Sequence, residues 1–436
     1  MRRFAYFLIV FVIPSFGFGQ AKLALREAIE YMLLNNYEIT LSKNEAAISS
    51  INNTKANAGM GPRINLTAAD NVSNNNLRQR FTNGNEIKRD FVFGNNLNAG
   101  ILLNWTIFDG YRMSANKARL DLIQKQGEAN YKLAIESSLS QLILAYYDIA
   151  RSKLQLQNID RQLDLLKDRL ILAKSRFEVG TATKLDYLQT QVELRTQQSN
   201  RLQQLNLITN AKLTLTQLMG KREFTDYDLL DSLSTDVAFA TYPGEIELAG
   251  NQQVIAQSYQ KLIAEQTVLE TRALSKPQVG FQSGYNFGFS QSQAGFSLYN
   301  LTHGLFAGLN FSMPIYDAGI NKRQVQVAKL NAMSAFTREN QLKDNLNIAY
   351  KRALNGYELA VQQFTNESNT LKIIEELYII AFERFKVNQS ASYLEMKEIQ
   401  KSLEDSRFRQ VTSLYQAKIA EIDLLRTQGK LIPAAF

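Results

Sequence analysis

Four segments alternate apolar and polar positions with the two-residue period of a β-strand, about 64–72, 97–108, 279–289 and 301–315. An apolar face opposite a face of Gly, Asn and Ser is typical of a strand between lipid and an aqueous lumen. A soluble sheet with one wet face gives the same alternation, and the strands alone leave both open. In the third segment the apolar residues are Val279, Phe281, Tyr285, Phe287 and Phe289, and the alternate ones are Gly280, Gln282, Gly284, Asn286, Gly288 and Ser290.

The number of these strands bears on assembly. Even eight strands leave a barrel interior with room for little beyond side chains, so four cannot enclose an open pore. If the four strands span a membrane, several copies of the chain must each contribute four.

A second pattern repeats every seven residues. It predicts long helices over about 111–177 and 319–385, with return helices over about 183–219 and 391–428, packed as antiparallel coiled coils. The first series is Ile135, Leu142, Ile149, Leu156, Leu163, Leu170 and Phe177, and the second is Tyr350, Tyr357, Phe364, Leu371, Tyr378 and Phe385.

The two halves of the chain are similar to one another. Trp105-Thr-Ile-Phe-Asp109 matches Met313-Pro-Ile-Tyr-Asp317, and Arg176-Phe177 matches Arg384-Phe385, with the same offset of 208 positions. We therefore expect two tandem repeats, 20–220 and 245–436, joined by a linker over 221–244. Each has a short helix, two strands, a long helix and a return helix. The short helices are expected over 23–58 and 245–274, and a polar loop over 74–96.

The start of the chain has the features of an export signal. Arg2 and Arg3 precede an apolar run from Phe4 to Ile13, and the small residues Gly17 and Gly19 follow. This predicts a signal peptide over residues 1–19. Its removal lowers the formal net charge from +8 to +6, without a basic stripe that would favour nucleic acid.

The composition excludes several kinds of metal site and catalytic site. There is no cysteine and one histidine, His303. Thiolate or His-rich metal sites and paired-His acid–base arrangements are therefore excluded. We expect no cofactor, no metal and no enzymatic activity. His303, in a strand near a loop, is interpreted as a membrane-edge residue.

These motifs, in this order and twice over, resemble the TolC-like outer-membrane efflux family across nearly the whole chain after residue 20. The matching pieces are Leu23-Ala-Leu-Arg-Glu-Ala28, Gly61-Pro62, Trp105-Thr-Ile-Phe-Asp109-Gly110, Phe177-Glu-Val-Gly180-Thr-Ala-Thr-Lys-Leu-Asp186, Leu218-Met-Gly220 and Met313-Pro-Ile-Tyr-Asp317-Ala-Gly319. The resemblance implies a homotrimer, with a twelve-stranded outer-membrane barrel above a helical tunnel in the periplasm. It further implies a periplasmic adaptor and, through it, an inner-membrane pump.

Strand gives way to helix at Asp109-Gly110 and at Pro314, Asp317 and Gly319. An Asp at such a place can cap the helix start, and Gly frees the backbone for the bend. We interpret these residues as structural hinges.

The far ends of the coiled coils are the turns Val179-Gly180-Thr181 and Val387-Asn388-Gln389. Gly, and less easily Asn, can end a helix in the left-handed conformation, which suffices to explain the turns. The resemblance adds adaptor docking at these tips. It also assigns Asp186 to a constriction at the pore entrance, with Glu395 its nearest counterpart in the second repeat; either acid can equally be a solvated surface residue.

Two functions from different classes remain. The first is an outer-membrane channel of a tripartite efflux or type I secretion system that conducts passively. The second is a non-conducting periplasmic scaffold in which the coiled coils tether the envelope layers. The polar pairs Gln197-Gln198 and Gln203-Gln204 can line water in a tunnel or form an ordinary exposed face.

Overall fold

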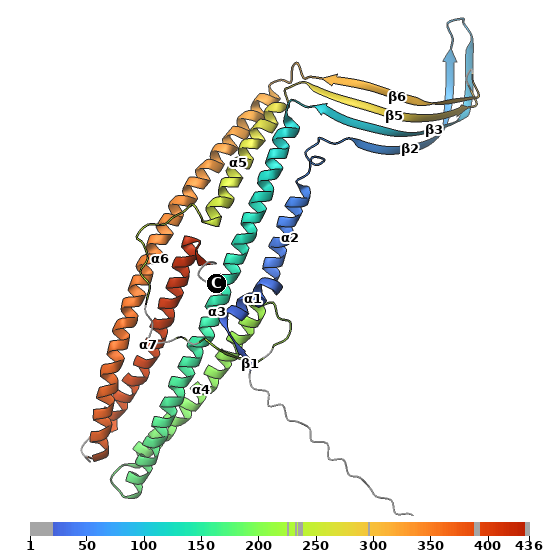
Figure 1. Ribbon diagram of the computed structural model, residues 1–436. Helices are drawn as coiled ribbons and strands as arrows, with labels where there is room; N and C mark the ends of the chain where they lie inside the picture. Colours follow the sequence, from blue (N-terminus) through green and yellow to red (C-terminus); the bar gives the residue numbers. More distant parts are fainter. Residues whose placement is uncertain are drawn as a thin grey trace, which may run out of the picture. The chain divides into compact units, whose positions relative to one another are not determined.

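A computed structural model describes residues 21–224, 226–231, 233, 239–294, 297–387 and 393–431. The expected signal peptide, Asn388 and Gln389 lie outside them. The elements are β1 (Ala21–Leu23), α1 (Leu25–Asn35), α2 (Tyr37–Asn52), β2 (Arg63–Arg80), β3 (Glu86–Phe108), α3 (Arg112–Glu178), α4 (Lys184–Leu218), β4 (Tyr227–Leu229), α5 (Gln252–Ala273), β5 (Gln278–Ser292), β6 (Tyr299–Ser312), α6 (Ile320–Val387) and α7 (Tyr393–Gln428) (Figure 1).

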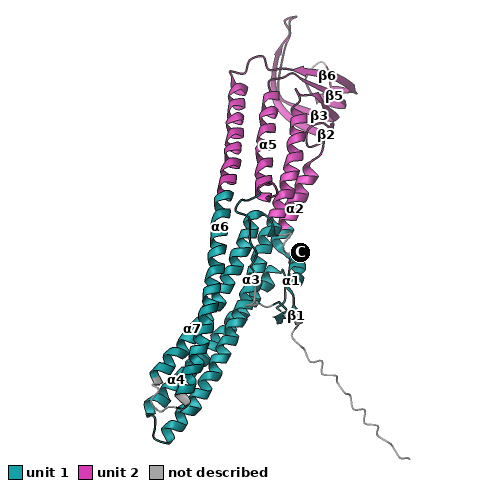
Figure 2. Cartoon of the chain, turned by 60° about the vertical axis from the view of Figure 1, so that its left-hand side comes forward, with its two compact units in different colours: residues 1–40, 134–247, 346–436 teal, residues 41–133, 248–345 magenta. Residues whose placement is uncertain are grey.

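The chain forms two compact units, which do not follow the two expected repeats (Figure 2). One unit combines residues 1–40, 134–247 and 346–436, and the other combines 41–133 and 248–345. Each unit therefore takes segments from both halves of the sequence. Among the described residues, no helix has the length and apolarity needed to cross a membrane.

The unit of residues 41–133 and 248–345 contains a four-stranded sheet in the order β2-β3-β5-β6. All three neighbouring pairs are antiparallel. Rows of paired residues cross the whole sheet, for example Leu66, Ile101, Tyr285 and Leu305. Most apolar positions of the four strands thus share one face, and most Gly, Asn and Ser positions share the other.

The expected polar loop over 74–96 is wrong. β2 continues to Arg80 and β3 begins at Glu86, so most of that segment is a hairpin that extends beyond β5 and β6 (Figure 1). Asn83-Gly84 forms its turn, with Gly84 at φ +86°. Polar residues do not prevent a strand when both its edges are hydrogen-bonded or wet, and Asn-Gly is a strong hairpin signal that polarity alone concealed.

The expected single helix over 23–58 is also wrong. Leu23 belongs to β1, α1 ends at Asn35, and α2 ends at Asn52. Asn36 breaks the helix: its backbone is extended, and its Oδ1 accepts hydrogen bonds from the N–H groups of Glu38 (2.9 Å) and Ile39 (3.1 Å). This is the action of an N-cap residue, so one Asn ends α1 and starts α2.

In the other unit, the linker packs against the helices. Its strand β4 pairs in parallel with β1. The buried Tyr146 hydroxyl donates to the carbonyl of Leu23 (2.9 Å) and lies 3.2 Å from the Asp231 carboxylate. Two further tyrosines bind linker carbonyls, Tyr350 that of Pro243 and Tyr357 that of Ala240.

The seven-residue series provides the core of this unit. Leu142, Ile149 and Leu163 of α3 are buried, and so are Tyr350, Tyr357, Phe364 and Leu371 of α6. Phe364 packs with Ala150 and Leu414, so α6 contacts both α3 and α7 here. The repeat predicted helix packing because only side chains that return to one side of a helix can form a continuous contact with its neighbours.

Candidate functional site

At the first strand-to-helix junction, Asp109 is 1% exposed. Its two carboxylate oxygens lie 3.1 and 3.0 Å from the N–H of Met113, and Arg112 Nε lies 3.4 Å from Oδ2. The carboxylate therefore satisfies an N–H group at the start of α3 and faces the positive end of the helix dipole. Gly110 follows at φ +71°, and a Cβ there would lie 2.4 Å from Lys276 Cβ.

The second junction is built in the same way but is more open. Asp317 Oδ1 accepts from the N–H of Gly319 (2.9 Å), and its Oδ2 from that of Asn321 (2.8 Å). Gly319 has φ +71°. Pro314 is exposed between β6 and this cap, and the neighbouring Ile315 is 97% exposed.

At the tip between α3 and α4, Gly180 has φ +81°, with no atom within 4 Å of an added Cβ. The N–H of Thr181 donates to the carbonyl of Arg176 (2.8 Å), which closes the end of α3. Apolar side chains surround this turn: Val179 is 75% exposed, and Leu185 is exposed as well. The turn thus has a hydrogen-bonded backbone and exposed apolar side chains.

Asp186 is half-buried in this tip and forms a capping box with Thr183. Its N–H donates to Thr183 Oγ1 (3.2 Å), while its Oδ2 accepts from the N–H and from the hydroxyl of Thr183 (3.2 and 2.7 Å). One carboxylate oxygen is therefore occupied in starting α4. Glu395 lies exposed in the first turn of α7, and Val387 ends α6.

A polar cluster that the sequence did not reveal joins α3, α4 and α7. Arg169 of α3 is 3% exposed, forms an ion pair with Glu193 of α4, and donates to Gln400 Oε1 of α7 (2.6 Å). Lys397 Nζ of α7 lies 2.8 Å from Glu193 Oε1. Breaking a buried pair by removing one partner costs far more than an exposed pair contributes, so the cluster holds α7 against the α3–α4 pair.

The expectation that the glutamine pairs of α4 line water or form an exposed face is wrong for one residue of each pair. Gln197 and Gln204 are buried, and they do not form a wet or exposed face. Gln197 Nε2 donates to Glu404 Oε1 (3.0 Å), and Gln204 Nε2 to the carbonyl of Ser152 (2.8 Å). The seven-residue spacing of Gln155, Gln162 and Arg169, and of Thr190, Gln197 and Gln204, is the signal that marks such positions.

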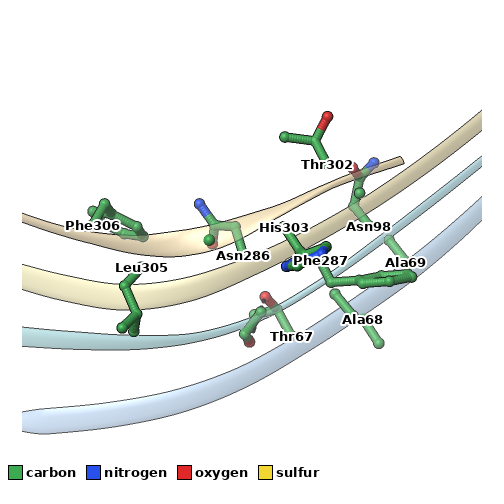
Figure 3. A pocket seen from close by; sticks show the side chains of 14 residues that line it. Thr67, Ala68, Ala69, Asn98, Asn286, Phe287, Thr302, His303, Leu305 and Phe306 are labelled. Carbon is green, nitrogen blue, oxygen red and sulfur yellow. Dashed lines mark hydrogen bonds between the residues drawn. The ribbon is translucent and has the colours of Figure 1, made fainter. Parts of the chain in front are cut away.

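Along strand β6, His303 lies away from the two ends of the sheet's apolar face. It is paired with Phe287 in the middle part of the sheet, and its Nδ1 lies 3.0 Å from the Tyr285 hydroxyl. In Figure 3, Thr302 and Leu305 point to opposite sides of the strands, which shows the two faces directly. The polar side carries Thr67, Asn98 and Asn286.

The two turn glycines make a matched pair for mutation. Gly180→Ala costs about 1 kcal/mol, because only the positive φ opposes a side chain there. Gly110→Ala costs roughly 2–5 kcal/mol, since it adds the clash with Lys276 to the same backbone strain. Thermal unfolding followed by circular dichroism checks this order; equal midpoints would contradict it.

Burial raises the pKa of Glu404, and a hydrogen bond from Gln197 opposes that effect only in part. A carboxyl group with a raised pKa in the folded state stabilises the fold at low pH and loses this contribution as pH rises. Glu404→Gln should therefore raise the unfolding midpoint at pH 7, with the gain vanishing below the ordinary Glu pKa. Glu398→Gln, at an exposed position of the same helix, is the control.

Residues 39–221 match the family model "Outer membrane efflux protein". The chain is 21% identical over 286 residues to the outer membrane protein TolC of Vibrio cholerae, which covers 64% of this chain and 61% of that protein's length. It is 22% identical over 346 residues to the outer membrane efflux protein BepC of Brucella suis, covering 76% and 72%.

The fold agrees over more of the chain. The structure of CusC, from a study of its folding and transmembrane channel formation, has a TM-score of 0.78 at 16% identity and covers 94% of this chain and 93% of that one. The family match over residues 39–221 and the two relatives confirm the resemblance to TolC-like outer membrane efflux proteins seen in the motifs, and the CusC structure has the same fold.

Proposed function

We propose that this protein is the outer-membrane channel of a tripartite efflux or type I secretion system, and that it conducts its substrate passively. Three copies would each contribute four strands to a twelve-stranded barrel, above a periplasmic tunnel of helices. The observation that carries the proposal is the sheet of one chain, whose apolar face is exposed and whose edge strands β2 and β6 each pair on one side within the chain.

The apolar face has the height of a membrane. Its two ends are taken at the row of Trp105 and Phe281 and at Phe93 toward the hairpin. The strand between them is about 40 Å long, and a tilt of about 45° reduces this to about 28 Å, close to a bilayer's hydrocarbon thickness. Leu305, between these rows, is 85% exposed, and Leu309, in the Trp105 row, is 72% exposed. Such a face is stable in lipid and costly in water.

Strand placement distinguishes the channel from a periplasmic scaffold. Purified protein should insert into planar bilayers and conduct. A lipid-soluble thiol reagent should label Leu309→Cys on the apolar face, whereas a membrane-impermeant one should label Gly308→Cys on the polar face, where an added Cβ meets open space. A soluble, non-conducting protein whose two cysteines react equally with the impermeant reagent would support the scaffold.

We further propose that the tip with Val179, Gly180 and Thr181 docks a periplasmic adaptor linked to an inner-membrane pump. The exposed Val179 and Leu185 are an apolar surface that a partner would cover. The second turn, Val387-Asn388-Gln389, is assigned to docking on the resemblance alone. Asp186 and Glu395 remain candidates for the entrance constriction, where like carboxylates would favour cations.

Gly180→Val should impair export in cells while leaving assembly and bilayer conductance intact, because it alters the docking turn far in sequence from the strands. Gly84→Val is the matched control, since Gly84 also has a positive φ with no atom near its added Cβ, but lies in the hairpin turn of the sheet. Unchanged export in Gly180→Val, or equal losses in both variants, would remove the tip from the docking surface.

A further inference from the structure

The apolar face of the sheet carries two charge-bearing side chains of opposite type. Between the Trp105 row and the Phe93 row, Asp70 and His303 are the acid and the base among the described residues of this face. They lie on the two edge strands, Asp70 on β2 and His303 on β6. An ionisable group facing lipid is costly unless it has a partner.

Those two edges are the ones that meet when copies assemble, so this inference rests on the proposed trimeric barrel. β2 runs outward from the helices and β6 runs back toward them, so β6 of one copy beside β2 of the next keeps the antiparallel order. The contact between two copies has a stagger, which is the number of residues by which a row of paired residues is displaced along the strands from one copy to the next.

Barrel geometry limits the stagger. Twelve strands tilted by about 35–45° need a total of roughly 12–18 residues, given a rise of about 3.3 Å and a strand spacing of about 4.8 Å. That is about four or six residues per copy, because an odd value would turn every side chain to the opposite face.

The hand of the sheet gives the direction of the displacement. The N–H of Gln293, just after β5, donates to the carbonyl of Phe93 on β3, so residues on the apolar face of β5 bond toward β3. In an L-peptide strand that runs outward, the backbone groups of residues facing the viewer point right. Seen from the apolar face with the outer end up, β2, β3, β5 and β6 are therefore arranged from right to left. The right-handed tilt of barrel strands then displaces each row toward the outer end as it passes from β2 to β6.

The length of β6 favours a stagger of four over a stagger of six. β6 has 14 residues, and a stagger of four pairs Tyr299 with Asn76 and Ser312 with Arg63. This match begins at the first residue of β2 and ends where a bulge between Asn75 and Leu77 interrupts its pairing with β3. A stagger of six leaves the start of β2 unpaired and carries β6 past the bulge.

A stagger of four also brings the two ionisable groups together. The row of Leu66, which contains Tyr285 and Leu305, then reaches Asp70 of the next copy. Within one chain, Tyr285 lies opposite Leu305, yet its hydroxyl is 3.0 Å from His303 Nδ1. Asp70 of the next copy has the same diagonal relation to His303 from the other side, within the reach of such pairs.

We propose that His303 of one copy binds Asp70 of the next, so that Tyr285, His303 and Asp70 form a polar chain across each seam of the barrel. The alternation of apolar and polar residues admits any even stagger. The pair supplies the register that alternation leaves open, because of the two staggers that barrel geometry allows, four brings the acid and the base together and six leaves them apart in lipid.

Disulfide formation tests the register directly, because the natural chain has no cysteine. Ala68→Cys/Ala307→Cys should link three chains covalently on mild oxidation, since a stagger of four sets these residues opposite each other at about 5.5 Å between Cα atoms. Ala68→Cys/Leu309→Cys, which would be opposite at a stagger of six, should stay unlinked. Both pairs leave Asp70 and His303 in place.

Charge exchange tests the pair itself. Asp70→Asn and His303→Asn should each lower the temperature at which detergent-solubilised trimers dissociate, and Asp70→His/His303→Asp should restore it. Asp90→Asn, an exposed acid on the hairpin, is the control. Linkage through Leu309→Cys, linkage through neither pair in a conducting trimer, or single variants that dissociate at the wild-type temperature would overturn the pair. A chain that neither assembles nor conducts would instead refute the proposed function.

Discussion

An apolar sheet face that one chain cannot cover is the constraint on which the rest of the structure depends. The apolar positions of four strands lie in rows on one side, with Leu305 and Leu309 largely exposed. Four strands are too few to close on themselves around a pore. Two needs follow together, a nonpolar surrounding for the face and further strands for the edges of β2 and β6. A membrane barrel assembled from copies of the chain meets both.

In the helical part, by contrast with the sheet, charged and amide side chains are buried between the helices. Arg169, Glu193 and Gln400 join three helices through charged and amide contacts, while the apolar series beside them provides packing. Hydrophobic contacts alone tolerate sliding between parallel helices, whereas a buried ion pair is satisfied in one arrangement. The cluster lies in the unit that holds the tips, where the proposed docking would take place.

The two halves of the chain are alike in plan and different in detail. Asp109 is buried at the first junction, whereas Asp317 and its neighbour Ile315 are more exposed. The first tip has Gly180 and a capping box with Asp186, and the second repeat has Leu394 in the position that corresponds to Asp186. The capping box also gives Asp186 a structural role that is separate from any role at an entrance. The linker, with β4 and the carbonyls that Tyr350 and Tyr357 bind, belongs to one unit only.

The sequence by itself determined the elements whose pattern is regular and long. Period-two alternation placed strands at 279–289 and 301–315 within a few residues of β5 and β6, and the seven-residue series placed α3 and α6. It missed the extended β2–β3 hairpin and the break at Asn36, because polar strands and caps depend on hydrogen bonds that composition does not reveal. Only the tertiary structure decided which buried positions are polar, how Asp186 is used, and where His303 lies in the sheet. These depend on which residues of distant segments become neighbours, and periodicity along one chain carries no information about partners across a helix interface or a strand pair.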